Sequence, residues 1–145
     1  MIEKSRLSTS YTARNAISKK SFNGIHIYMD YITYEEFKKM DIRIGTIRQI
    51  EPVPETDKLL RCQIDFNEKD EAGKPALRQI ISGIRQYYPE YESLIGKQVL
   101  YIINLEPRKI KGFESNGMLM AVDGTDGKPV FLIPDVVVES GTKVR

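Results

Sequence analysis

The feature that most limits the possible folds is a strict alternation of apolar and polar side chains over residues 60–66. The apolar members are Leu60, Cys62, Ile64 and Phe66, with one polar residue between each pair. Successive side chains of a β-strand point to opposite faces, so this pattern predicts a strand with one buried face. It also places Cys62 in a core and not at a reactive site.

Several more short strands are expected on either side of this one. They cover residues 42–50, 77–81, 99–103, 118–122 and 130–133, and residues 136–138 are expected to form a last extended segment. The run at residues 99–103 is continuously apolar, which predicts a strand buried on both faces. Gly45 lies where the apolar phase shifts, so we expect a bulge or tight bend there. Residues 67–75 are polar and contain turn formers, which predicts a hairpin loop.

Helical structure is expected to be scarce. Residues 33–36 read Thr-Tyr-Glu-Glu, a capping box that predicts a short helix through Met40, and residues 90–94 indicate a further helical turn. Many short strands with bends at glycine predict a small all-β barrel. Five strands with short helices are typical of an OB-fold, a Greek-key barrel, although the pattern alone also permits an SH3-like barrel.

The charge of the chain is unevenly distributed. The whole chain carries a net charge of +2, but residues 1–28 carry +4 and the remainder carries −2. A uniformly basic surface is therefore excluded for the folded part, and binding to a polyanion would need a local cluster of cations. We expect residues 1–29 to form a disordered tail and residues 30–145 to form one domain.

The chemistry-bearing residues argue against an enzyme. A single cysteine, Cys62, cannot form an internal disulfide, which fits a reducing cytoplasm. With His26 as the only histidine, a metal site rich in these residues is excluded, and no cofactor is expected. No apolar run is long enough to cross a membrane. No glycine-rich phosphate loop or nucleophile elbow is present, so a catalytic role is not expected.

The local cluster of cations lies between Gly96 and Phe113, where Glu106 is the only acid. Pro107 and Gly112 predict a loop that leaves the basic side chains in solvent. On composition alone, a solvated basic loop is the simpler explanation. The cations are Lys97, Arg108, Lys109 and Lys111.

Three side chains in or next to this segment are suited to contacting an RNA base. Asn104 offers an amide suited to a base edge, Ser115 offers a hydroxyl, and Met118 offers an adaptable apolar surface for a base. A cationic rim around a polar and apolar floor is what single-stranded or looped RNA requires. The segment therefore indicates an RNA-binding surface.

Several sequence pieces occur in a characteristic order along the chain. They are Asp41-Ile-Arg-Ile-Gly45, Asp57-Lys58-Leu59-Leu60, Arg78-Gln-Ile-Ile-Ser-Gly83, Gly96-Lys97 and, most specific, Asn104-Leu-x-Pro107-x-Lys109-x-x-Gly112-x-x-Ser115-x-Gly117-Met118. With these pieces, the chain from about residue 31 to residue 144 resembles the tRNA-binding domain family. That domain occurs at the C-terminus of many methionyl-tRNA synthetases, in tyrosyl- and phenylalanyl-tRNA synthetase subunits, and as small free-standing proteins.

The resemblance implies an OB-fold that holds tRNA by shape and charge with little sequence preference. Arg43 could contribute from the barrel wall or form a structural ion pair, and Lys97 is a further candidate. The basic tail could act as an arm that strengthens RNA binding, or could be a mis-set start or a disordered extension. Together with Lys111, the expected tRNA-binding residues are Lys58, Asn104, Arg108, Lys109, Ser115 and Met118.

The resemblance also implies a biological role. We expect a non-catalytic tRNA-binding protein that assists an aminoacyl-tRNA synthetase of the methionyl type in trans. A homodimer is expected, with residues 136–138 supplying an interface or completing the core. The alternative is a small dimeric chaperone-like protein that binds exposed polypeptide on the same fold. Such relatives tend to alter the pieces at residues 57–60 and 115–118, and both are intact here, which favours RNA.

Overall fold

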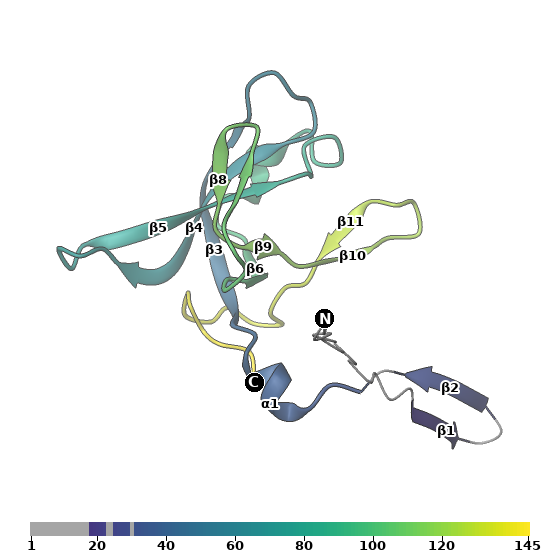
Figure 1. The fold of residues 1–145 in the computed structure, drawn as a ribbon. Coiled ribbons are helices and arrows are strands. Elements are labelled where there is room, and N and C mark those ends of the chain that lie inside the picture. Colours follow the sequence, from purple (N-terminus) through teal and green to yellow (C-terminus); the bar gives the residue numbers. More distant parts are fainter. Residues whose placement is uncertain (1–17, 23–24, 30) are drawn as a thin grey trace, which may run out of the picture. The chain divides into compact units, whose positions relative to one another are not determined.

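The computed structural model describes residues 18–22, 25–29 and 31–145 and divides the chain into two compact units, Met1–Lys38 and Lys39–Arg145 (Figure 1). In the first unit, β1 (Ser18–Phe22) pairs antiparallel with β2 (Ile25–Met29). This hairpin lies within the segment for which a disordered tail was expected, and the remainder of that segment lies outside the described residues. Neither of the helices that the structure describes is long and apolar enough to cross a membrane.

The helix α1 (Tyr34–Lys38) begins at the capping box expected from the sequence. The hydroxyl of Thr33 accepts the backbone N–H of Glu36 at 3.1 Å, and the Glu36 carboxylate accepts the backbone N–H of Thr33 at 2.6 Å. Both donors belong to the first turn, where no helical carbonyl is available to them. The helix prediction is therefore confirmed, although the helix ends before Met40.

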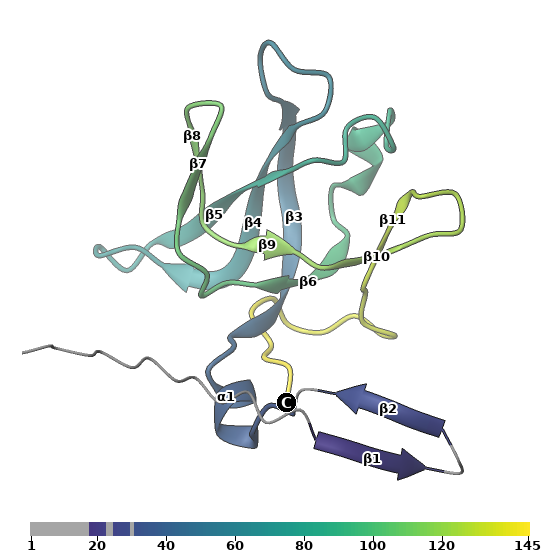
Figure 2. The same cartoon turned by 45° about the vertical axis from the view of Figure 1, so that its right-hand side comes forward.

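The second unit is built on one curled antiparallel sheet of five strands, in the order β5-β4-β3-β6-β9 (Figure 2). With almost no helix, it forms the all-β, OB-like half-barrel expected from the sequence. The strands of this sheet are β3 (Ile42–Pro52), β4 (Leu60–Lys69), β5 (Pro75–Ser82), β6 (Gln98–Ile102) and β9 (Met118–Leu119).

Two small hairpins and one short helix complete this unit. The first hairpin is formed by β7 (Arg108–Ile110) and β8 (Phe113–Ser115), and the second by β10 (Ala121–Asp123) and β11 (Pro129–Phe131). The 3-10 helix η1 (Tyr91–Leu94) lies where a helical turn was predicted. The segment at residues 118–122 was predicted as one strand, but it contains the end of the main sheet and the start of the second hairpin.

The core lies inside the curl of the sheet, and the alternating residues of β4 supply much of it. Leu60 and Ile64 are completely buried, and Cys62 is 2% exposed. Burial disfavours the thiolate and raises the pKa of Cys62 to about 12, which makes it unreactive. The predicted core position of Cys62 is confirmed.

Two predictions about strands are corrected by the packing. Residues 99–103 were expected to be buried on both faces, but in β6 Val99 and Tyr101 are buried while Leu100 is half-buried, because one face packs on the core. No bulge occurs at Gly45; the register between β3 and β4 shifts between Ile47 and Gln49. Gly45 is required by close packing instead, since a Cβ there would lie 2.4 Å from Ile64 Cγ2.

The polar loop predicted at residues 67–75 is shorter than expected. The strands β4 and β5 continue to Lys69 and from Pro75, and their register shifts between Asp65 and Glu68. Asp70 closes the remaining turn, because its carboxylate accepts the backbone N–H groups of Ala72 and Lys74, each at 2.9 Å. Polar composition therefore gave the wrong extent for the loop, because both strands are exposed in this region.

Candidate nucleic-acid interface

The basic segment predicted as a loop is the β7–β8 hairpin, which carries Arg108, Lys109 and Lys111 as exposed side chains. At its tip, Lys111 has φ 51° and Gly112 has φ 84°. Positive φ at both central residues is the requirement of a type I′ two-residue hairpin turn. The turn thus holds three cations on a short, regular structure and not on an irregular loop.

The hairpin is fastened along the outer edge of β5. The Gln79 side-chain amide donates to the backbone carbonyl of Glu114 at 2.8 Å, and the backbone carbonyl of Gln79 accepts the backbone N–H of Asn116 at 2.9 Å. Above this contact, the Arg61 guanidinium lies 4.8 Å from the centroid of the Phe113 ring. The sequence analysis did not single out Arg61 or Gln79, because nothing along the chain marks their contact with residues 113–116.

Ser115 is buried in this contact between β8 and β5. It is 6% exposed, its hydroxyl accepts the backbone N–H of Ile81 at 3.0 Å, and it donates to the carbonyl of Gly117 at 3.3 Å. Its hydrogen-bonding groups are therefore engaged by the backbone. The structure connects β8 to β5 through this hydroxyl.

Asn104 is also engaged by the backbone. Its side-chain oxygen accepts the N–H of Asp41 at 2.7 Å, and its side-chain nitrogen donates to the carbonyl of Lys39 at 2.6 Å. The amide expected to meet a base edge therefore holds the entry into β3. The sequence could not show this, because the partners are 63 and 65 residues away.

Met118 lies between two hollows of the surface, with 52% of the residue exposed. The first hollow has a volume of about 240 Å³ and the second about 230 Å³. Met118 and the nearly buried Ile81 line both of them. The first hollow is also lined by Leu105, Glu106, Arg108 and Ile110, and the second by Gly83, Ile84, Leu119 and Pro129.

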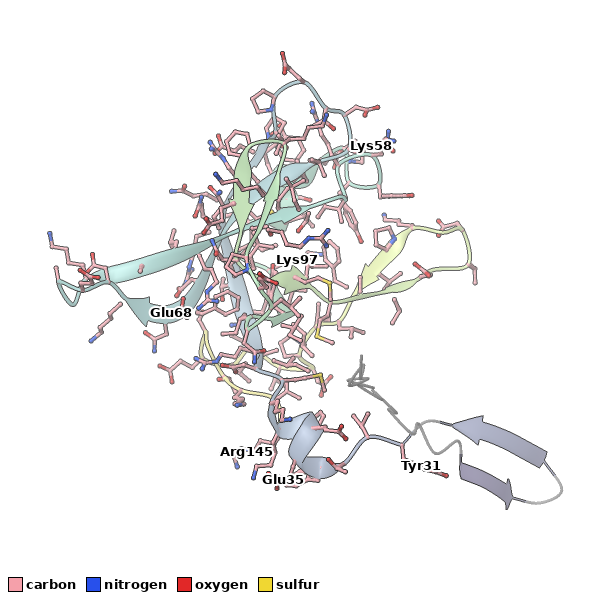
Figure 3. The ribbon with its side chains drawn as sticks, viewed as in Figure 1. Tyr31, Glu35, Lys58, Glu68, Lys97 and Arg145 are labelled. Atoms are coloured by element: carbon pink, nitrogen blue, oxygen red, sulfur yellow. The ribbon has the colours of Figure 1, made fainter. Side chains whose placement is uncertain are left out.

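Lys58 is exposed in the loop between β3 and β4, at the end of the unit toward which the tip of the β7–β8 hairpin also projects (Figure 3). The carbonyl of Lys58 accepts the backbone N–H of Arg85 at 3.1 Å. Arg85 directly follows Ile84 of the second hollow, and its guanidinium donates to the carbonyl of Thr56 in the same loop. Arg108 therefore lines the first hollow directly, whereas Lys58 lines neither hollow.

The two additional candidates lie apart from these hollows. Arg43 donates to both carboxylate oxygens of Asp41, each at 2.9 Å, so it forms the structural ion pair left open by the sequence. This hydrogen bond lowers the pKa of Asp41 below its ordinary value of 3.8. Lys97 lines a third hollow of about 300 Å³ together with residues 133–137, none of which borders Met118.

Comparison with known proteins identifies the class to which this fold and surface belong. A family model described as a putative tRNA binding domain matches residues 42–143. That match covers most of the chain. The chain belongs to the tRNA-binding domain family, and the resemblance stated from the sequence is confirmed.

Particular relatives connect the domain to methionine–tRNA ligases. The ligase of Methanosarcina mazei is 42% identical over 114 residues, which are 79% of this chain and 15% of that protein. The ligase of Porphyromonas gingivalis is 45% identical over 114 residues, which are 79% of this chain and 16% of that protein. The chain therefore spans about a sixth of the length of these relatives.

Solved structures of short chains match over almost their whole length. A MetRS related protein from Pyrococcus horikoshii has a TM-score of 0.69 and 32% identity, covering 81% of this chain and 100% of that one. The chaperone CsaA from Bacillus anthracis has a TM-score of 0.64 and 30% identity, covering 79% of this chain and 99% of that one. The fold is thus shared with proteins described in two different ways.

Proposed function

We propose that this protein is a non-catalytic tRNA-binding protein that assists an aminoacyl-tRNA synthetase of the methionyl type in trans. The observation that carries the proposal is the grouping of three exposed cations on the β7–β8 hairpin beside the exposed Met118. Membership in the tRNA-binding domain family supports tRNA as the ligand of this surface.

The expected binding mode is recognition by shape and charge. Arg108, Lys109 and Lys111 would contact phosphates from the β7–β8 hairpin, where Arg108 lines the first hollow, and Lys58 would do so from the loop between β3 and β4. Phosphate contacts release counterions and carry no information about base sequence. Binding should therefore be similar for different tRNAs and should weaken steeply as salt is raised.

The synthetase partner is inferred from the relatives. The methionine–tRNA ligases match this chain over about a sixth of their own length. A protein that resembles only that part of a ligase would add affinity for tRNA and leave the aminoacylation chemistry to the ligase. Association of the protein with the ligase would then place two tRNA-binding modules in one complex, and the increase in affinity would come from effective concentration.

A homodimer is part of the same proposal. Val136 is 66% exposed and Val137 is 88% exposed, so these two residues do not complete the core of their own chain. Neighbouring apolar side chains left in solvent are typical of a surface that a partner covers. We expect Val137→Asp to convert the dimer to a monomer in light scattering, and a monomeric wild-type protein would contradict this part of the proposal.

The function is tested by a gel-shift titration with bulk tRNA at two salt concentrations, with duplex DNA and an unfolded polypeptide as competitors. Lys109→Ala should weaken binding and flatten its salt dependence by about one unit of log–log slope. Met118→Ala should weaken binding with almost no change in slope, because it removes apolar surface and no charge. Unchanged affinity in both variants would show that this surface does not bind tRNA.

A chaperone-like function is the second candidate, favoured by one observation. Two CsaA chaperone structures, from Bacillus anthracis and Picrophilus torridus, match this chain at 30% and 29% identity with TM-scores of 0.64 and 0.66. Apolar hollows beside Met118 would suit side chains of an extended polypeptide as well. Retention of the unfolded polypeptide with no binding of tRNA would favour this function.

A further inference from the structure

We propose that the two hollows beside Met118 receive two neighbouring unpaired nucleobases of the bound RNA, with the Met118 side chain between them. This inference rests on the proposed tRNA-binding function and adds to it. Charge and shape alone require no contact with bases, whereas the hollows offer places for bases that a paired helix cannot present.

The arrangement of the hollows suggests a pair of equal sites and not one larger cleft. Ile81 is 7% exposed and lines both hollows, so it forms a floor that they share. Met118 of β9 also lines both hollows, but it is 52% exposed. The volumes are nearly equal, at about 240 and 230 Å³. Both are below the roughly 300 Å³ at which sites for whole small molecules begin. Each hollow is therefore suited to one flat ring.

The lining of the first hollow favours a base over a phosphate. Leu105 and Ile110 offer apolar surface to the face of a ring, and the thioether of Met118 is polarisable and adaptable. Glu106 also lines this hollow, and its carboxylate would repel a phosphate but can accept a hydrogen bond from an exocyclic amine. The base would thus lie in the hollow while its phosphate stays outside.

A cation lies where a phosphate beside the first base would then be, because Arg108 lines the first hollow. The exposed Lys58 belongs to the loop between β3 and β4, and its backbone carbonyl accepts the N–H of Arg85, the residue after Ile84 of the second hollow. A strand that crosses Met118 would therefore meet the positive charge of Arg108 at one end of a mainly apolar floor. This combination of stacking surface and flanking positive charge is typical of single-stranded RNA binding. It fits RNA better than an apolar polypeptide, which would not use that charge.

The inference is tested with two short oligoribonucleotides of equal length, one with bases and one with an abasic backbone of the same charge. Affinities for the full-length protein are measured by fluorescence anisotropy, with bulk tRNA titrated in parallel. We expect wild-type protein to prefer the strand with bases on the order of tenfold. Met118→Ala should abolish most of this preference at an unchanged salt slope. Val122→Ala is the matched control, because Val122 is 51% exposed but lines neither hollow.

The outcomes separate this inference from the proposed function. Equal affinity for the two strands, with salt-sensitive tRNA binding intact, would overturn the base sites and leave the tRNA-binding function standing. Absence of tRNA binding would overturn both. Displacement of the base-carrying strand by an unfolded polypeptide from wild-type protein, but not by an abasic strand, would assign the hollows to polypeptide side chains.

Discussion

The guanidinium of Arg61 lies over the ring of Phe113, with Cζ 4.8 Å from the ring centroid, and so connects the start of β4 to β8 of the basic hairpin. Arg61 belongs to β4 and is held from its other side by Glu51 of β3, whose carboxylate accepts its Nε–H at 2.7 Å. The cation–π contact therefore extends an ordered ion pair into the hairpin. We infer that it fixes the direction in which Lys109 and Lys111 project.

Replacing Phe113 tests that role without altering charge. Phe113→Leu should weaken tRNA binding by about two- to fivefold, because a cation–π contact at an exposed site is worth roughly 0.5–1 kcal/mol. The salt slope should not change, since all cations remain. Phe113→Tyr keeps the aromatic face and should bind as wild type does. Equal losses in both variants would mean that Phe113 acts in some other way.

Lys97 provides a test of which cations belong to the tRNA site. It lines the hollow with residues 133–137 and not those beside Met118. Lys97→Ala should therefore leave tRNA affinity within about twofold and the salt slope unchanged, whereas Lys109→Ala should flatten the slope by about one unit. Filter binding at several salt concentrations measures both. A comparable effect of Lys97→Ala would extend the RNA path to the hollow that Lys97 lines.

Asn104 separates a structural role from a binding role. Asn104→Ala removes the hydrogen bonds to the backbone of Asp41 and Lys39, and should lower the free energy of unfolding by about 1–2 kcal/mol. Urea unfolding measures this loss. The tRNA affinity of the folded variant should match that of the wild type. A loss of affinity with unchanged stability would show instead that the amide contacts RNA.

The Asp41–Arg43 pair predicts an acid dependence of stability. The hydrogen bond from Arg43, together with the charges of Arg43, Lys143 and Arg78, holds the pKa of Asp41 below its ordinary value of 3.8. Its stabilising effect is therefore complete above about pH 4 and is lost as the pH falls through the lower pKa of the folded state. The stability difference between wild type and Asp41→Asn should shrink below about pH 4. A difference that stays constant with pH would contradict this assignment.

The elements that were predicted most accurately from the sequence are those determined by residues close together along the chain. The alternation at residues 60–66 and the capping box at residues 33–36 each depend on neighbours along the chain, and both are present in the structure. The β7–β8 hairpin was missed because its strands are three residues each and carry charges where apolar alternation would be needed. Gly112 was the only residue of this turn whose type indicated a turn, because Lys111 adopts a positive φ that is uncommon for lysine.

The candidate site was predicted in part for the same reason. Exposed cations and Met118 could be located because charge and apolar character are properties of the residue itself. The roles of Ser115 and Asn104 depend on backbone groups 34 and 63 residues away, which only the folded chain brings near. Polar residues of a motif can therefore hold the backbone that shapes a surface.

The Ser115–Ile81 hydrogen bond makes one amide proton a natural reporter of this surface. The N–H of Ile81 is bound by a side-chain hydroxyl at the edge where β8 meets β5, while Ile81 itself lines both hollows. Separation of the hairpin from the sheet would expose that proton, so its exchange with deuterium measures local opening. RNA held across Met118 should slow this exchange more than it slows exchange in the core strands. Occupancy of the surface could then be followed at a single backbone position in a protein without substitutions.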